Sequence, residues 1–197
     1  SIVVWSQPDT TRPSTNTAYY HVDQYALDTM GLELIAGENF TEADVEYVES
    51  GRNTDPVKTI VSQALAQDLF PGPPEQAVGR VLYESGGAPV QIIGVVRQLQ
   101  APWTSFSGVE RSMMIPRVTL DGQSLYLIRT EPGELNNMMV RTEEALAGSD
   151  PARLIMGLKS LPEARDESYR VDSSMSQVLQ VVIVTLVFIT SMGIVGL

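Results

Sequence analysis

The chain of 197 residues is 43% hydrophobic and 19% charged, which predicts a folded core rather than a disordered tether. It carries 24 acidic against 13 basic residues, a net charge of −11, and Lys and Arg form no cluster in it, which argues against nucleic acid and anionic lipid headgroups as partners. Cysteine is absent, which excludes disulfides, thiolate metal sites and thiol catalysis and leaves the cellular compartment open.

Short β-prone segments alternate with helix signals in the first part of the chain. Asp23 can cap a short helix that runs through Met30 and ends at Gly31. Thr41, with Asp44 at the third position after it, predicts a helical turn. Strands are expected at Ile2–Trp5, Ala18–Val22 and Leu32–Ile35.

The middle of the chain is rich in predicted strands. Ser62 can cap a helix over Gln63–Leu69, which the prolines from Pro71 onward would stop. A Ser-Gly-Gly turn between two apolar segments predicts a β-hairpin, and Pro116 is expected to close a later strand. The strands expected in this part are Val57–Val61, Val81–Glu84, Val90–Val96, Ser112–Ile115 and Leu125–Arg129.

A predicted helix and a polar segment connect this part to the C-terminus. Apolar residues recur at helical spacing over Glu134–Leu146, and Leu154–Met156 is expected to be a short strand. From Glu163 the sequence continues without a helix breaker into the final apolar stretch. If Glu163–Ser176 is helical, it joins the domain to that stretch as a stiff rod, so we expect it to transmit displacement. The residues assigned to this coupling helix are Arg165, Tyr169 and Arg170.

The last twenty residues, Val178–Leu197, contain no charge. At about 1.5 Å per residue they span roughly 30 Å as a helix, the thickness of bilayer hydrocarbon. A buried strand is the alternative, since eleven of the twenty are Val, Ile or Thr, but strands usually run to only about 3–10 residues. We therefore expect a domain over residues 1–175, a transmembrane helix over 176–197, and a longer polypeptide that continues beyond Leu197.

Few side chains could take part in catalysis or bind a metal ion. His21 lacks spaced partner ligands, so a surface or satisfied interior imidazole is expected in place of a metal or catalytic role. The acidic cluster of Asp44, Glu46 and Glu49 could do acid/base work, but a solvated face is the stronger expectation in so acidic a chain. The sequence has no Gly-x4-Gly-Lys-Ser/Thr phosphate loop and no nucleophile elbow. We therefore assign no catalytic, cofactor-binding or metal-binding residue.

Trp103 and Phe106 lie in a long loop, Arg97–Arg111, directly after Pro102 and close to it, respectively. They predict either a small satellite core or an exposed patch that contacts a partner protein.

Several short motifs in one order resemble the periplasmic core domain of MacB-type ABC transporter permeases. The final segment, which ends in Met192-Gly-Ile-Val-Gly196, resembles the following membrane span of the FtsX-like family. The chain departs from the family pattern at Gly37-Glu38, Ser62-Gln63 and Arg97-Gln98, which bears on partner and substrate rather than on fold. The motifs are Tyr25, Gly31-Leu32, Gly37, Phe40-Thr-Glu-Ala-Asp44, Val61-Ser-Gln-Ala64, Leu69-Phe70-Pro71, Ala77-Val-Gly-Arg80, Ile93-Gly-Val-Val96, Ile115-Pro116 and Arg129-Thr130.

The resemblance implies a non-catalytic α+β domain on the periplasmic side of a bacterial inner membrane. It implies two lobes, one mixed α/β and one β-rich over roughly residues 57–124, and a place between the first two spans of a permease subunit. A separate or fused cytoplasmic ABC ATPase would drive the subunit and dimerise it, and a periplasmic or outer-membrane partner is expected to dock. The domain would then convert ATP-driven membrane motion into export or other extracytoplasmic work.

Two other classes of protein stay open at this point. An extracytoplasmic sensor domain ahead of a signalling helix would share the anchor but would continue into a cytoplasmic kinase or coiled coil rather than into further spans. A membrane-anchored hydrolase would need a catalytic constellation, which the sequence does not display.

Overall fold

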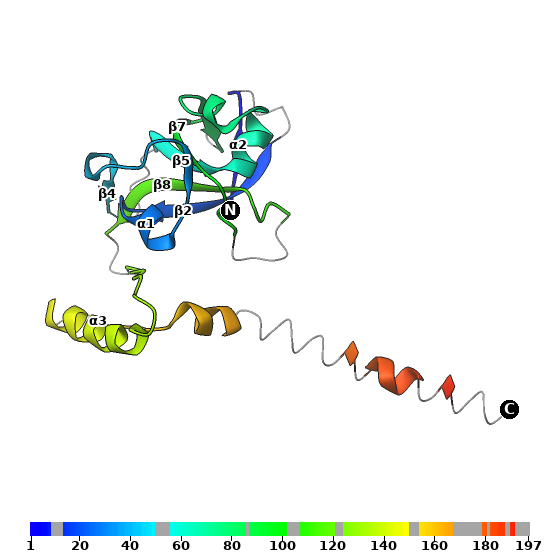
Figure 1. Cartoon of the computed structure of the whole chain (residues 1–197). Coiled ribbons are helices and arrows are strands. Elements are labelled where there is room, and N and C mark those ends of the chain that lie inside the picture. The colour runs from blue at the N-terminus through cyan, green and yellow to red at the C-terminus, as the bar shows by residue number, and fades with distance from the viewer. Residues whose placement is uncertain are drawn as a thin grey trace. The chain divides into compact units, whose positions relative to one another are not determined.

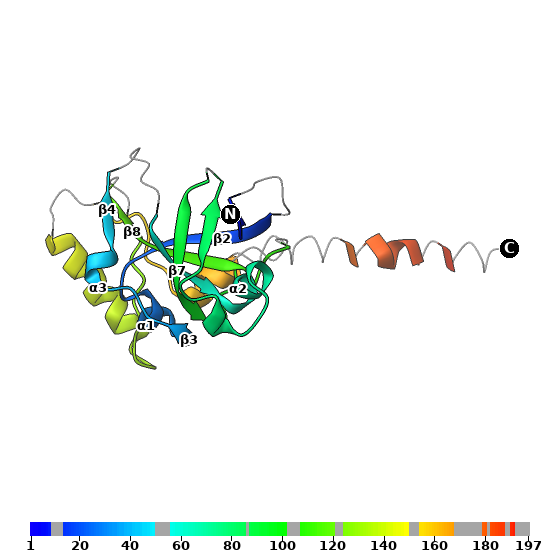
Figure 2. The same ribbon diagram turned by 90° about the horizontal axis from the view of Figure 1, so that it is seen from above.

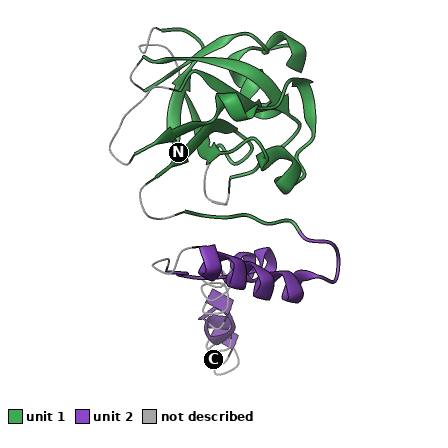
Figure 3. Ribbon diagram, turned by 90° about the vertical axis from the view of Figure 1, so that its left-hand side faces the viewer, with its two compact units in different colours: residues 1–129 green, residues 130–197 purple. Residues whose placement is uncertain are grey.

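The computed structural model describes residues 1–8, 14–49, 56–85, 87–101, 107–120, 124–149, 154–167, 179–180, 182–187 and 190–191 (Figure 1). The chain divides into two compact units, residues 1–129 and residues 130–197, and each is described by itself (Figure 3).

Unit 1 combines strands with two short α-helices, so the expected mixed α/β character is present. Single 3-10 turns lie at Glu42–Asp44 and Pro74–Gln76. In chain order the described elements are β1 (Ile2–Trp5), β2 (Thr15–Val22), α1 (Ala26–Met30), β3 (Leu34–Gly37), β4 (Glu46–Val48), β5 (Lys58–Ser62), α2 (Gln63–Leu69), β6 (Val81–Glu84), β7 (Pro89–Val96) and β8 (Ser112–Thr119).

Six strands pair in a closed ring. β1 pairs antiparallel with β2 and β6, β6 pairs antiparallel with β7, and β7 pairs parallel with β5. β5 then pairs antiparallel with β8, and β8 returns to β2 as a parallel neighbour (Figures 1 and 2). β3 and β4 join outside this ring, on β7 and β8. The strands β5 to β8 belong to the stretch expected to be β-rich, and their sheet also includes β1 and β2.

One apolar cluster fills the inside of the ring. Side chains from five ring strands and from α2 form it, which requires that they all point to the same face of the closed sheet. Burial of each large aliphatic side chain stabilises the fold by about 1.5–3 kcal/mol relative to exposure. The buried members are Val4, Val61, Leu65, Ala66, Leu69, Ala77, Leu82, Val90, Ile92, Val95, Met113 and Ile115.

A second cluster lies on the outer face of the ring and attaches α1 to it. Leu27 of α1 and Phe40 pack there against Ile60, Ile93, Val96 and Met114. A β-bulge sets which face the β7 residues occupy: Thr59 pairs with Ile92, but the next residue of β5 pairs with Gly94, so Ile93 is an extra residue. Ile93 faces outward by the ordinary alternation of a strand, and the extra residue shifts that alternation so that Val95, three positions after Ile92, faces inward again.

Three details of unit 1 differ from expectation. Asp23 is not the N-cap of α1, which is Tyr25, although its Oδ1 accepts a 3.0 Å hydrogen bond from the N–H of Tyr25. Pro116 does not close β8, which continues to Thr119. It lies after the last residue of β8 that pairs with β5, Met114, and before the first that pairs with β4, Arg117, and it is the last residue in register with β2, opposite Val22. The expected strand Leu125–Arg129 is not formed: these residues are exposed and belong to no sheet.

Unit 2 contains α3 (Leu135–Ser149), in agreement with the expected helix, and a second helical segment over residues 161–167. No side chain of α3 is buried. The expected strand Leu154–Met156 is not formed. Within the residues that the structure describes, no helix combines the length and apolar character needed to cross a bilayer. The described residues 179–180, 182–187 and 190–191 are helical.

Candidate functional site

The long loop that carries Trp103 and Phe106 has two described stems, residues 97–101 and 107–111, and each is attached to another part of unit 1. The two aromatic residues themselves lie outside the described residues. In the first stem, Arg97 donates to both carboxylate oxygens of Glu33, with Nε–Oε2 and Nη2–Oε1 distances of 2.5 and 2.7 Å. This hydrogen bonding to Arg97 lowers the pKa of Glu33. Both side chains are 60% exposed, so the pair fixes the geometry of the stem and contributes little to stability.

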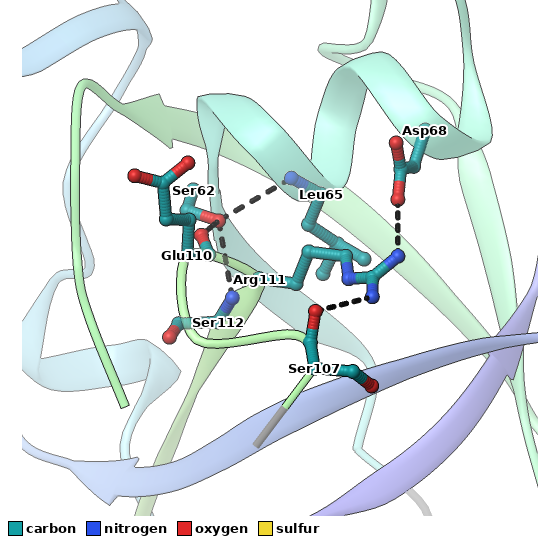
Figure 4. Close-up of polar contacts among 7 residues, drawn as sticks. All are labelled: Ser62, Leu65, Asp68, Ser107, Glu110, Arg111 and Ser112. Carbon is teal, nitrogen blue, oxygen red and sulfur yellow. Dashed lines mark hydrogen bonds and ion pairs between the residues drawn. The ribbon is translucent and has the colours of Figure 1, made fainter. Parts of the chain in front are cut away.

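The second stem is held to α2 by Arg111 (Figure 4). Its Nη1 lies 2.6 Å from Oδ2 of Asp68, and its Nη2 donates a 3.1 Å hydrogen bond to the carbonyl of Ser107. The guanidinium therefore connects the last turn of α2 to the start of the described second stem.

Ser62 forms a buried hub beside this contact (Figure 4). Its Oγ donates to the carbonyl of Glu110 at 2.7 Å and accepts from the backbone N–H of Ser112 at 3.0 Å. It also accepts from the N–H of Leu65 at 3.4 Å, the N-cap contact expected from the sequence. One hydroxyl thus joins the start of α2, the second stem and the first residue of β8.

The loop closes between Ala101 and Val109, whose N–H and carbonyl form a 2.6 Å hydrogen bond. Ala101 is buried, so this bond is shielded from water. The described residues on the two sides of the loop are thus joined to each other and to the rest of unit 1.

His21 is an exposed residue, in agreement with the surface alternative expected from the sequence. It lies on β2, where its ring contacts Tyr19 edge-on at a centroid distance of 5.0 Å. Burial, and then the positive charge of Arg117, lower the pKa of His21. Burial, and then the charge of Glu84, raise the pKa of Tyr19 to about 12. Among the described residues, no group of three His, Asp or Glu side chains is placed to hold a metal ion.

Two carboxylates of the acidic cluster over residues 44–49 form ion pairs with different basic side chains. Asp44 accepts from the backbone N–H and Oγ1 of Thr41, which completes the expected capping box, and from Lys58 Nζ at 2.5 Å. Glu46 binds Arg117, whose side chain is 8% exposed, at 3.1 Å. Glu49 is exposed. Asp44 and Glu46 therefore fasten the segment around β4 to the ring, at β5 and β8.

The described start of the coupling helix is capped in the way that its sequence allows. Ser160 and Glu163 form a reciprocal pair: Ser160 N–H donates to Oε2 of Glu163 at 2.9 Å, and Glu163 N–H donates to Oγ of Ser160 at 3.3 Å. The backbone hydrogen bond from Ser160 lowers the pKa of Glu163. Arg165 is exposed and lies 3.5 Å from Asp166, while Tyr169 and Arg170 lie outside the described residues.

Hydroxyl groups near the C-terminus are satisfied by their own helical segment. Thr190 Oγ1 donates to the carbonyls of Leu186 and Val187 at 2.9 and 3.0 Å, and Ser191 Oγ donates to Val187 at 2.7 Å. Such bonds satisfy polar groups without water.

The stem contacts escaped sequence reasoning because their partners are distant in the chain. Arg97 and Glu33 are 64 positions apart, and Arg111 and Asp68 are 43 apart. Hydrophobic periodicity carries no information on such pairs. The local contacts, at Ser62 and Thr41, followed capping rules and were predictable.

Comparison with known proteins identifies the family of this chain. Residues 2–154 match the family model of the MacB-like periplasmic core domain. The chain belongs to this family. The resemblance to the MacB-type periplasmic core domain is thereby confirmed, and the match covers unit 1 from its second residue and the start of unit 2. No curated protein sequence matches the chain.

Solved structures similar to this MacB-like domain include the periplasmic region of MacB from Actinobacillus actinomycetemcomitans, at 18% identity and a TM-score of 0.42, over 58% of this chain and 43% of that one. The extracellular domain of the noncanonic ABC-type transporter YknZ from Gram-positive bacteria is similar at 22% identity and a TM-score of 0.40, over 58% of this chain and 49% of that one. A domain of a putative permease protein from Porphyromonas gingivalis is similar at 14% identity and a TM-score of 0.40, over 77% of this chain and 72% of that one. The chain thus spans less than half the length of the first two.

Proposed function

We propose that this MacB-like domain is the extracytoplasmic part of an ABC transporter permease subunit. In this role it converts ATP-driven motion of the membrane part into rearrangement outside the membrane. The observation that carries the proposal is the order of the chain: a family match over residues 2–154 precedes a capped helix and then an uncharged stretch of bilayer length.

The domain acts in this proposal as a coupling module without turnover of its own. The carboxylates that could act in acid/base catalysis take part in structural contacts instead: Asp44 caps a turn and binds Lys58, and Glu46 binds Arg117. His21 lies against Tyr19. ATP hydrolysis is assigned to a cytoplasmic ATPase subunit or domain, since the sequence contains no phosphate loop.

The connection to the membrane is assigned to residues 161–197. The helix that starts at residue 161 would continue into the apolar stretch, where Thr190 and Ser191 satisfy their hydroxyls on the backbone, as a lipid environment requires. We assign the domain to the periplasmic side of a bacterial inner membrane, in a permease dimer. A periplasmic or outer-membrane partner would contact the loop that carries Trp103 and Phe106.

Two measurements on the full-length protein test this proposal. A Cys placed at Ser173, in a background without other cysteines, should react in intact cells with reagents that do not enter the cytoplasm. A nitroxide on Glu75→Cys, an exposed site, should change its distance to the same label in the second copy when ATP and vanadate are added. Labelling from the cytoplasmic side alone, or copurification with a kinase output module instead of an ATPase, would replace the permease proposal with the sensor alternative.

A further inference from the structure

Arg129, the last residue of unit 1, reaches the C-terminal end of α1, 101 positions earlier in the chain. Its Nη1 donates a 3.0 Å hydrogen bond to the backbone carbonyl of Asp28. The carbonyls at a helix C-terminus lack partners within the helix and carry the negative end of its dipole. α1 has no basic residue in its own last turn, so Arg129 supplies the missing cation from a distant part of the chain.

Gly31 makes room for this contact. Its φ of 66° gives α1 a left-handed C-cap, and its N–H donates to the same Asp28 carbonyl at 3.2 Å. A Cβ at this position would lie 2.7 Å from Nη1 of Arg129. Glycine at position 31 therefore serves both the reversal of the chain and the approach of the guanidinium.

The segment before Arg129 has no comparable attachment. Residues 124–128 are outside any sheet, and Leu125 and Ile128 are 99% and 48% exposed. Within the described range 124–130, Arg129 is the residue whose side chain forms a hydrogen bond to another part of the chain. On its other side, α1 is attached to the ring through Leu27, which packs in the outer apolar cluster.

We propose that Arg129 and the C-terminal end of α1 form a clamp that fixes the point where the chain leaves unit 1, and that Arg129 is a positioning residue for mechanical coupling. The inference rests on the proposed function. With the clamp closed, displacement that arrives from Thr130 onward is applied to α1 and, through Leu27, to the ring. With it open, we expect the exposed residues 124–128 to move independently of α1, so that less of the displacement reaches the ring.

The first arm of the test measures the clamp itself in the full-length protein. A nitroxide on Thr130→Cys should show restricted motion in the parent, and Arg129→Met, which keeps the stem but removes the donor, should at least double the mobile fraction. Arg129→Lys should give an intermediate value, and Arg141→Met, on an exposed position of α3, should change nothing. An unchanged spectrum in Arg129→Met, in protein whose thermal transition shows that unit 1 is folded, overturns the clamp.

The second arm measures coupling with the Glu75→Cys label and ATP with vanadate. Arg129→Met should lose more than half of the ATP-dependent distance change while ATPase activity stays within twofold of the parent. A full distance change in Arg129→Met, together with a mobile residue 130, overturns the coupling role. If the parent itself shows no ATP-dependent change, the proposed function fails, and the first arm still decides whether the clamp exists.

Discussion

Gly37 and Gly94 face each other where β3 crosses β7, and neither position has room for a side chain. A Cβ on Gly94 would lie 2.7 Å from the carbonyl oxygen of Glu38, and a Cβ on Gly37 would collide with the carbonyl of Ile93. Gly37 also has a φ of 78°. The two glycines allow β3 to approach β7 closely enough to cover the outer cluster.

Gly94→Ala should therefore destabilise the fold by about 1–3 kcal/mol, the usual effect of overpacking a core. Urea unfolding followed by circular dichroism measures the change. Gly148→Ala is the matched control, because its added Cβ would meet no atom within 4 Å beyond its own helix backbone and chain neighbours, and alanine favours the helix. Equal midpoints for Gly94→Ala and the parent would show that the crossing tolerates a side chain.

Ser62→Ala should destabilise unit 1 by about 1–3 kcal/mol, because it removes the α2 cap and leaves the buried N–H of Ser112 without its partner. Chemical unfolding gives the change in free energy. Ser85→Ala, at an exposed turn, should be neutral. A loss no larger than that of Ser85→Ala would contradict the role of Ser62 as a hub.

Acid should weaken the attachment of the segment around β4 through Asp44. The hydrogen bond from Lys58, followed by those from Thr41, lowers the pKa of Asp44 to about 2. Because the folded pKa lies below the unfolded value of about 3.9, the stabilisation is complete above that value and is lost as the pH falls toward 2.

Asp44→Ala should accordingly lower stability by about 1 kcal/mol at pH 7, and its stability should approach that of the parent near pH 2. Thermal melts between pH 7 and pH 2 measure the difference, with Glu49→Ala as the exposed control. A difference between Asp44→Ala and the parent that persists unchanged at pH 2 would exclude this carboxylate as its source.

Trp103→Ala separates the two expectations for the long loop. As a partner contact presented by fixed stems, Trp103 should be dispensable for folding, so we expect a change in stability within about 0.5 kcal/mol, which is typical of surface sites. Calorimetry of the purified domain measures it. A loss above about 2 kcal/mol would assign Trp103 to a satellite core instead.

Arg170→Pro tests the rod between domain and membrane. A Pro inside a helix costs about 3 kcal/mol and kinks it, so the variant should insert and fold normally, keep near-normal basal ATPase activity and lose the ATP-dependent movement of the domain. Arg170→Ala should be tolerated. If Arg170→Pro moves like the parent, the stiffness of this connection has no part in coupling.

Local rules carried much of the element prediction. The capped helix Gln63–Leu69 and the strand Val81–Glu84 have the expected bounds, because caps and turns are encoded by neighbouring residues. The ring was not predictable in this way. It depends on which strands pair, and β2 and β8 belong to distant parts of the sequence, so no local pattern specifies their contact.

The segment Leu125–Arg129 shows the opposite case, because it has strand-like residues and forms no strand. A strand needs a neighbour to satisfy its backbone, and apolar, β-prone residues state only that pairing would be favourable. The motif Arg129-Thr130 marked this position, but its contact with Asp28, 101 positions earlier in the chain, could not be predicted from the sequence. The sequence therefore indicates which segments can form a strand or a helix, and tertiary contacts determine which of them do so.

Closure of the ring by β8 places a constraint on the order in which the domain can fold. The parallel pairing Ala18–Ser112 to Val22–Pro116 joins the two ends of unit 1, so the ring stays open until nearly all of its chain is available. Contacts of such high sequence separation form slowly, and an incomplete sheet keeps unpaired edges that can capture other strands. During synthesis from the N-terminus, the edge of β2 that pairs with β8 would thus stay unpaired until β8 is available.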